Sequence, residues 1–344
     1  MKILFLSHNF YPVIGGIEVI SELLADAFVE AGHEVHLLTW APDSSEKQFK
    51  YKVSRNPGLL NLFKAHAWAD VVFENNICLR LSWPAIFFNR TSVIALHTWI
   101  ARITGKRGLQ DRIKYLWLKR STKVIAVSKA LRSASWSDAT IVGNPYRALE
   151  FKVMPDVNRN KAFVFLGRLV SDKGVDLAIL ALHKFKQQYE SKLPTQEDFS
   201  LTIIGDGPEL GNLKRMVTDL NLSKEVTFLG SLTGNDLVLV LNAHKILLVP
   251  SRWQEPFGVV VLEGLACGCI PIVSDGGGLS EAVGDAGLTF RTGDVDDLVA
   301  KMLLLTQDTE LKNELIAKSA LHLSNFHPDR VTSQYLEAIE NSNN

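Results

Sequence analysis

Two glutamates eight positions apart, Glu255 and Glu263, are the residues whose type and spacing point most directly to chemistry. They lie where a buried strand is predicted to turn into a helix, with Pro256 at the first helical position and Glu255 at the cap. Helical rise would separate the two carboxylates by about 12 Å, more than the roughly 5–9.5 Å between glycosidase carboxylates. This separation matches the distance from the sugar of a nucleotide-sugar to its ribose. Glu255 as a helix cap alone is the alternative. Backbone N–H groups free to hold an anion follow at Phe257, Gly258 and Val259.

A basic pair, Arg168 and Lys173, occupies another predicted turn from strand to helix. Both side chains can converge on a diphosphate there, through charge-assisted contacts of about 1.5–3 kcal/mol each. Two such cations can take the place of a divalent ion, so we expect no metal and no cofactor besides the sugar donor. A pair of solvated loop residues is the structural alternative.

Weaker signals follow other predicted strands. Gly205-Asp206-Gly207-Pro208 and the glycine loop Gly276–Gly278 are also typical of ordinary turns. His97 follows an apolar run, where a lone histidine is usually structural. Backbone suited to reading a nucleotide base is expected at Leu229, Gly230, Ser231 and Leu232.

The elements that must position these residues are short apolar runs alternating with helical patterns. The predicted strands of the first half are 3–6, 35–39, 70–73, 92–96, 123–127 and 140–142. Those of the second half are 163–166, 201–204, 226–229, 246–249 and 270–273. Such a series indicates an α/β fold with two Rossmann-like, doubly wound domains facing a central cleft. Ligands of such sheets bind beyond the carboxyl ends of the strands, where the residues above are found.

Length and composition agree with two globular domains. The chain has 344 residues, 47% of them hydrophobic and 22% charged. We expect an N-terminal domain over residues 1–150 and a C-terminal domain over 160–325. A terminal helix within 326–344 is expected to cross back to the first domain. The three cysteines form no disulfide framework and have poor zinc spacing. With no signal peptide or membrane span recognised, we expect a cytoplasmic protein.

Taken in order, these segments resemble family 4 of the retaining glycosyltransferases (glycosyl transferases group 1), which have the two-domain GT-B fold. The resemblance covers most of the chain and is strongest from Phe163 to Gly287. It begins at Gly16 and continues through Gly167–Gly174, Gly205–Pro208 and Glu255–Glu263 to the glycine loop. One such motif would carry little weight, whereas the ordered set is specific.

The resemblance implies a role for each matching residue. His97 and Glu255 would be catalytic, and Glu263 would bind the ribose of a UDP-sugar. The donor diphosphate would be bound by Gly16, Arg168, Lys173, Gly258 and Val259. The donor sugar would be bound by His97, Glu255, Pro256, Phe257 and Gly258. The base would lie on residues 229–232. The implied reaction moves a hexose or hexuronic acid, with retention of configuration, to a glycan or lipid-linked acceptor in polysaccharide or glycolipid assembly.

The N-terminal half departs from the family's pattern. It is short between Trp40 and Asp70, and Phe73-Glu74-Asn75-Asn76 replaces the family's usual histidine-bearing turn. Because that domain normally chooses the acceptor, the acceptor stays open.

Charge is shared unevenly along the chain, although the net charge is zero. Residues 1–150 carry 19 Lys and Arg against 12 Asp and Glu, which leaves 18 against 25 in the rest. Most of the excess lies in Arg102–Lys123, where apolar residues and Trp117 interleave with basic ones. This pattern predicts a basic amphipathic helix that contacts an anionic membrane, placing the protein peripherally at the inner membrane face. A solvated helix packed on its own sheet is the alternative. The basic half lacks the pattern of nucleic-acid-binding modules, so no nucleic acid is expected.

Two other functions remain open from the sequence. A sugar-nucleotide 2-epimerase shares the architecture but would need further acid and base residues. A non-catalytic nucleotide-sugar-binding subunit would not need the full set of Arg168, Lys173, Glu255, Glu263 and His97. The sequence does not identify the sugar. Arg252 and Lys106 are candidates for binding the carboxylate of a uronic acid, although a neutral hexose is favoured.

Overall fold

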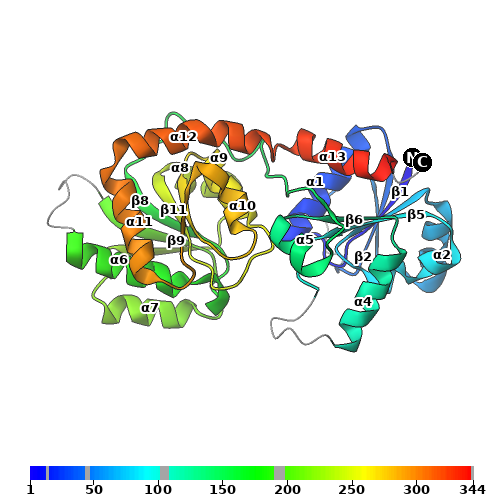
Figure 1. The fold of residues 1–344 in the computed structure, drawn as a ribbon, viewed down its shortest axis with the longest axis horizontal. Helices are drawn as coiled ribbons and strands as arrows, with labels where there is room; N and C mark the ends of the chain where they lie inside the picture. Colours follow the sequence, from blue (N-terminus) through cyan, green and yellow to red (C-terminus); the bar gives the residue numbers. More distant parts are fainter. Residues whose placement is uncertain (13–14, 43–46, 101–107, 190–197, 342–344) are drawn as a thin grey trace. The chain divides into compact units, whose positions relative to one another are not determined.

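The computed structural model describes residues 1–12, 15–42, 47–100, 108–189 and 198–341 (Figure 1). The chain divides into two compact units. Unit 1 comprises Met1–Pro145 together with His327–Asn344, and unit 2 comprises Tyr146–Phe326. The chain therefore enters unit 2 after Pro145 and returns to unit 1 for its last helix. Each unit has its own parallel sheet and is described by itself.

Unit 1 is built on a parallel sheet with the strand order β3-β2-β1-β4-β5-β6-β7 in the described residues. Its central strands carry continuous apolar runs because both faces are covered by helices. The strands are β1 (Lys2–Leu6), β2 (Glu34–Thr39), β3 (Lys52–Arg55), β4 (Val71–Asn75), β5 (Thr91–Leu96), β6 (Lys123–Ala126) and β7 (Thr140–Ile141).

The helices of unit 1 cover this sheet with apolar faces. α1 buries Ile20, Leu24 and Phe28, and the Phe28 ring packs on Phe73 of β4 with centroids 5.5 Å apart. Tyr335 of the last helix contacts the same Phe73 ring at 5.8 Å. The helices are α1 (Gly16–Glu30), α2 (Leu59–Trp68), α3 (Leu79–Ser82), the 3₁₀ turn η1 (Trp83–Phe87), α4 (Leu109–Arg120), α5 (Lys129–Ser135) and α13 (Pro328–Glu340).

Unit 2 has the parallel strand order β10-β9-β8-β11-β12-β13 in its described residues, which is the Rossmann order. The strands are β8 (Lys161–Leu166), β9 (Asp198–Ile204), β10 (Val226–Gly230), β11 (His244–Val249), β12 (Ile270–Ser274) and β13 (Leu288–Phe290). The helices are η2 (Ser171–Lys173), α6 (Val175–Tyr189), α7 (Leu210–Asp219), α8 (Gly234–Asn242), α9 (Val259–Ala266), α10 (Leu279–Val283), η4 (Gly284–Ala286), α11 (Val295–Gln307) and α12 (Thr309–Ser324).

Helices cover both faces of this second sheet. Alternate residues of β8 and β11, such as Phe163 and Ile246, share a buried core with α6 and α11. Leu247 faces the other way and meets Gly264 of α9 so closely that a methyl group there would overlap its side chain. Since α9 carries Glu263, this close packing sets the height of that glutamate over the sheet.

The two Rossmann-like domains predicted from the sequence are confirmed, and the predicted strands agree with the observed ones to within a few residues. The prediction missed β3, α2 and β13. Strand β3 is half exposed and only four residues long, so its apolar run is weak. The stretch between Trp40 and Asp70 contains both β3 and α2.

Candidate functional site

The loops after β8 and β11 meet at the point in unit 2 where the strand order reverses. This switch point is where open α/β sheets bind ligands. The ammonium of Lys173, from the first loop, lies 2.8 Å from Oε1 of Glu255, from the second. The Ser251 hydroxyl donates to the same oxygen at 2.5 Å. A cation and a buried carboxylate from two predicted motifs are thus brought together.

Backbone contacts hold the same two loops in register. The N–H groups of Arg252 and Trp253 both donate to the carbonyl of Asp172, at 2.8 and 3.2 Å. Gly174 has a φ of 67°, and a Cβ there would overlap the carbonyl oxygen of Pro250. Glycine is therefore required at 174, because this approach leaves no room for a side chain. Arg168, at the start of the first loop, is exposed.

The Glu255 segment differs from the sequence prediction. Helix α9 begins at Val259, not at Pro256, and its cap is Gly258 in a left-handed conformation with a φ of 111°. The N–H of Gly278 donates to the carbonyl of Glu255 at 2.7 Å, which ties this segment to the glycine loop. Glu255 is therefore held in a loop by tertiary contacts and does not cap the helix. The 12 Å separation deduced from helical rise does not apply, and the first-turn N–H groups of α9 belong to Val259 and Val260.

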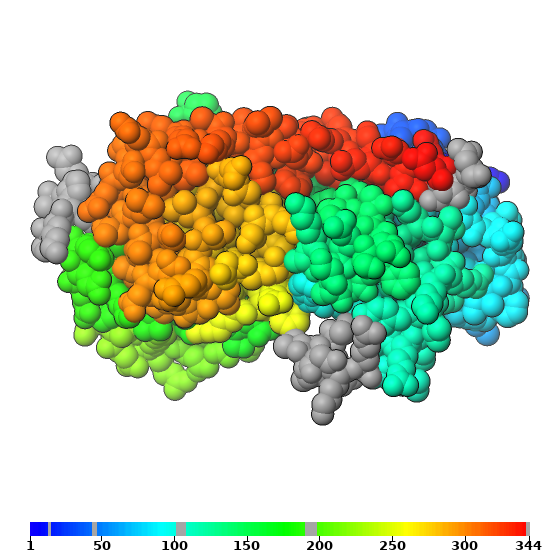
Figure 2. All heavy atoms as spheres, in the orientation of Figure 1, coloured from blue at the N-terminus to red at the C-terminus, as the bar shows by residue number. Residues whose placement is uncertain are grey.

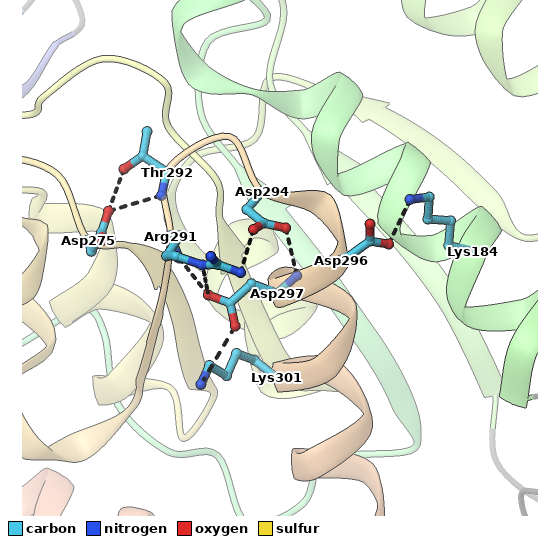
Figure 3. Close-up of polar contacts among 8 residues, drawn as sticks. All are labelled: Lys184, Asp275, Arg291, Thr292, Asp294, Asp296, Asp297 and Lys301. Atoms are coloured by element: carbon cyan, nitrogen blue, oxygen red, sulfur yellow. Dashed lines mark hydrogen bonds and ion pairs between the residues drawn. The ribbon is translucent and has the colours of Figure 1, made fainter.

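The glycine loop after β12 is anchored through Asp275 (Figure 3). Asp275 accepts hydrogen bonds from the N–H of Thr292 at 3.0 Å and from its hydroxyl at 2.7 Å. These bonds hold the pKa of Asp275 below its ordinary value. Its ionised carboxylate thus ties the loop that carries Gly278 to the end of β13.

Beside this anchor, Asp294-Val295-Asp296 has the spacing of an Asp-x-Asp metal motif. Figure 3 shows both carboxylates engaged in structural contacts. Asp294 caps α11 and pairs with Arg291 at 2.7 Å, while Asp296 pairs with Lys184 of α6 at 2.7 Å. In the described part of the chain, no group of three or more His, Cys, Asp or Glu residues is arranged to hold a metal ion.

Glu263, on α9, contacts a residue that the sequence analysis did not single out. Nη2 of Arg147 lies 3.4 Å from Oε1 of Glu263, and Nη1 of Arg147 lies 2.8 Å from Glu150. Burial raises the pKa of Glu263 above its ordinary value, and the nearby Arg147 opposes that effect. No spacing rule links residues 147 and 263, so only the folded chain reveals the contact.

The segment predicted to read a base lies at the same sheet edge. β10 ends at Gly230, whose carbonyl accepts a hydrogen bond from the N–H of Gly205 at 2.7 Å. Leu229 is 40% exposed and Ser231 is exposed, so residues 229–232 offer accessible backbone. Both turns therefore lie close together at the carboxyl ends of β9 and β10.

In unit 1, His97 directly follows β5 and is only 6% exposed. Burial lowers its pKa to about 4, against a smaller opposing effect of the Asn144 side chain. Neither ring nitrogen has a well-aligned hydrogen bond within the described residues, and Asn144 Oδ1 has none either. Burial therefore favours the neutral ring at pH 7.

Gly16 is the first residue of α1 and is exposed, with open space where a side chain would lie. A buried hydrogen-bond network fixes the start of this helix. The Ser21 hydroxyl contacts that of Ser7, after β1, at 2.8 Å, and accepts from the Asn75 amide, on β4, at 2.7 Å. The helix N-terminus is thus fixed beside the ends of β1 and β4, which is the switch point of this sheet.

Glu74, in the sequence that departs from the family's pattern, is completely buried on β4. Its carboxylate accepts from the indole N–H of Trp117 at 2.7 Å and from the backbone N–H of Cys78 at 2.8 Å. Burial raises the pKa of Glu74 to about 7. Trp117 therefore anchors α4 to the sheet, which corrects the expectation that it lies on a membrane-facing surface.

The exposed face of α4 combines apolar and basic residues, and Figure 2 shows this part of unit 1 at the molecular surface. Leu109, Ile113 and Leu116 are 75%, 44% and 65% exposed and recur at helical spacing. Arg112, Lys119 and Arg120 are exposed between or beside them, and the acidic residue of the helix, Asp111, is buried. Residues 102–107 of the predicted basic stretch, including Arg102 and Lys106, lie outside the described residues. In the parts that are described, no helix is both long and apolar enough to span a membrane.

Comparisons with known proteins identify the family. The sequence model described as "Glycosyl transferases group 1" matches residues 148–322. The N-acetyl-α-D-glucosaminyl L-malate synthase of Bacillus anthracis is 25% identical, over 94% of this chain and 93% of its own. The GDP-mannose-dependent monoacylated α-(1-6)-phosphatidylinositol monomannoside mannosyltransferase of Corynebacterium glutamicum is 32% identical, over 45% of this chain and 40% of its own.

The fold agrees with solved structures. The Anabaena protein HepE, in complex with UDP and glucose, superposes with a TM-score of 0.82 over 99% of this chain and 100% of its own, at 21% identity. This likeness supports the GT-B fold, with two Rossmann-like domains.

Proposed function

The chain belongs to the glycosyl transferases group 1 and is a glycosyltransferase, and on that premise we propose that it moves a hexose from a UDP-sugar with retention of configuration. In this proposal, unit 2 binds the donor through Arg168, Lys173, Glu255 and Glu263. Unit 1 contributes Gly16 and His97 and selects the acceptor.

The observation that carries the proposal is the contact between Lys173 and Glu255 at the switch point of unit 2. An ammonium there suits a diphosphate, and a carboxylate beside it suits the hydroxyl groups of a sugar. The exposed Arg168 and the first N–H groups of α9, at Val259 and Val260, would complete the diphosphate site.

The proposed reaction proceeds on one face of the sugar. The bond between the anomeric carbon and the diphosphate oxygen breaks, and the acceptor oxygen attacks the same face. The acceptor hydroxyl gives its proton to the departing phosphate. Lys173 and Arg168 would stabilise the charge that develops on that phosphate. His97, neutral because of its burial, would orient and polarise the sugar.

For the sugar, a neutral hexose is favoured over a hexuronic acid. Arg252, a candidate for binding a uronic carboxylate, instead pairs with Asp176 through Nη1 and Nη2, each at 2.5 Å.

For the base, uracil is supported by the UDP complex of HepE, whereas the Corynebacterium relative is named for GDP-mannose. We propose UDP because HepE binds this nucleotide and residues 229–232 offer accessible backbone for a base at the sheet edge.

Metal independence is part of the same proposal. Two cations, Arg168 and Lys173, would do the work of a divalent ion at the diphosphate. Transfer that persists in excess EDTA supports this part. Transfer restored only by added Mg²⁺ or Mn²⁺ contradicts it.

We also propose a glycan or lipid-linked acceptor, with α4 resting on an anionic membrane surface. The exposed face of α4 presents three apolar and three basic residues and no acid, which suits an interface of acidic head groups. This contact would place a lipid-linked acceptor near unit 1. No membrane insertion is required.

The deciding experiment incubates the protein with UDP-glucose, UDP-galactose, UDP-N-acetylglucosamine, UDP-glucuronic acid and GDP-mannose, alone and with candidate acceptors. Acceptor-dependent release of UDP supports transfer, and NMR of the product gives its anomeric configuration. An inverted product overturns the retaining mechanism. A new nucleotide-sugar formed without acceptor would instead indicate an epimerase, and binding without any product a non-catalytic subunit. Family membership makes these alternatives the less favoured outcomes.

A further inference from the structure

We propose that Arg147 is a positioning residue for donor binding, which holds the Glu263 carboxylate ionised and turned so that one oxygen is free for the ribose hydroxyls. The inference rests on the proposed ribose role of Glu263. It adds a residue, just beyond the boundary between the units, that acts through Glu263 without touching the reacting atoms.

Three contacts fix the Arg147 side chain within unit 2. Its guanidinium lies 4.8 Å above the centroid of the Phe151 ring, a cation–π distance. Nη1 pairs with Glu150 at 2.8 Å, and Nη2 lies 3.4 Å from Oε1 of Glu263. The guanidinium is planar and held at three points, so it can orient the carboxylate it faces.

Because Glu263 is buried, its contact with Arg147 affects whether the carboxyl group is ionised. The Glu263 side chain is only 13% exposed, and loss of solvent favours the protonated acid. Arg147 is the positive charge that faces it, while Glu150 acts in the opposite sense. Cys267, one turn further along α9, is a buried thiol that stays protonated. Arg147 is therefore the group that favours the ionised form of Glu263, against the larger effect of burial and the smaller one of Glu150.

The geometry leaves one oxygen of Glu263 open. Arg147 contacts Oε1, whereas Oε2 makes no hydrogen bond or ion pair within the described residues and is not a buried orphan. An ionised carboxylate accepts hydrogen bonds at both oxygens, and protonation converts one of them into a donor. A ribose needs acceptors for its hydroxyls, so the ionised form is the one that binds.

Glu150 restrains the effect of Arg147. It takes the shorter of the two ion pairs, and its Oε1 is buried without a hydrogen-bond partner. Removing the charge of Glu150 should therefore strengthen the interaction of the Arg147 guanidinium with the Glu263 carboxylate. Variants of Arg147 and of Glu150 should therefore shift the protonation of Glu263 in opposite directions.

The test measures the affinity for UDP and for 2′-deoxy-UDP by calorimetry between pH 5.5 and 8.5. Using the ratio of the two affinities cancels the titration of the phosphates. The wild type should prefer UDP by about 10-fold, as expected for a hydrogen bond to a charged group, with little dependence on pH near neutrality. Arg147→Met should lose several-fold of that preference at pH 6 and regain it as pH rises, because Glu263 then ionises only at higher pH. Arg147→Lys should retain most of the preference.

Glu150→Gln gives an independent test should Arg147→Met fold poorly. In this variant the preference for UDP over 2′-deoxy-UDP should be lost only at a lower pH than in the wild type, because Arg147 then pairs with Glu263 alone. Arg147→Met/Glu263→Gln should show a preference that does not change with pH, because the amide of Gln does not titrate. Lys318→Met, which changes an exposed lysine on α12, should match the wild type.

Two negative results have different meanings. If the wild type does not distinguish UDP from 2′-deoxy-UDP, the ribose role of Glu263 is wrong. If the wild type distinguishes them but neither Arg147→Met nor Glu150→Gln changes the pH profile, the role of Arg147 is overturned and that of Glu263 stands.

Discussion

Lys173 and Glu255 are separated by 82 positions in the chain, yet the Lys173 ammonium lies 2.8 Å from the Glu255 carboxylate. The pair joins the loops after β8 and β11, which are neighbouring strands in unit 2. The Glu255 side chain is 11% exposed and that of Lys173 is 25% exposed. A pair so well shielded, at the reversal of a parallel sheet, lies where such sheets bind ligands, as the proposed donor site requires.

Substitution of Glu255 should affect turnover, whereas substitution of Lys173 should affect UDP binding. Glu255→Gln should lower the turnover number by about 10²-fold, because a group that stabilises the reacting sugar is lost, and should leave UDP affinity unchanged or higher. Lys173→Met should weaken UDP binding by about 10-fold or more. Steady-state kinetics and calorimetry measure the two effects. Glu314→Gln and Lys318→Met, which break an exposed pair on α12, are the matched controls. Equal loss of UDP affinity in both site variants would contradict the assignment.

His97→Ala should reduce turnover strongly while UDP affinity changes by less than about threefold. In the proposal the imidazole contacts the donor sugar, so the affinity for UDP, which lacks that sugar, should not depend on it. His36→Ala is the control, because His36 is also a buried histidine of unit 1, with a pKa of about 4, and it contacts Ser54 at 2.9 Å away from the proposed site. A His97→Ala protein with the wild-type rate would exclude the proposed catalytic role.

Trp117→Phe should destabilise unit 1 by an amount that increases with pH. Glu74 has a pKa of about 7 in the folded protein, raised by burial from an ordinary 4.5. Its favourable contribution is therefore complete below pH 4.5 and is lost as pH rises through about 7. The indole hydrogen bond favours the ionised form, so removing it should cost about 1–3 kcal/mol at pH 8 and less at pH 5.5.

Urea denaturation at both pH values measures this difference. The titrations of histidines in unit 1 are common to both proteins and cancel. In a Glu74→Leu background, Trp117→Phe should lose its dependence on pH. A constant difference in the Glu74 protein would mean that the indole bond does not respond to the charge of Glu74.

Charge reversal on α4 should weaken binding to anionic vesicles. Arg112→Glu/Lys119→Glu should reduce co-sedimentation with vesicles of phosphatidylglycerol and phosphatidylcholine by about 10-fold or more, because each basic residue contributes about 1 kcal/mol near such a surface. Wild-type binding should weaken as salt rises. Lys312→Glu/Lys318→Glu, on α12, makes the same charge change elsewhere. If the wild-type protein does not co-sediment with these vesicles at low salt, the membrane proposal is wrong and α4 is a solvated helix.

Much of the fold could be predicted because its signals are local. The apolar runs of β8, β11 and β12 are buried on both faces, so they read as strands without knowledge of their neighbours. Strand β3 and helix α2 were missed because the first is short and half exposed and the second has exposed leucines at its start. The start of α9 was misplaced because Glu255 and Pro256 satisfy the local rules for a helix N-terminus, whereas contacts with Gly278 hold them in a loop.

The sequence by itself determined which residues follow the strands, and a parallel sheet places all such residues at one edge. That was enough to predict Arg168, Lys173, Glu255 and Glu263 as one group. Only the tertiary structure decided which of them touch and what else faces them. It paired Lys173 with Glu255, placed Arg147 against Glu263 and turned Trp117 inward to Glu74. These contacts join positions dozens of residues apart, where no periodicity acts, and they depend on burial, which sets the charge of each group.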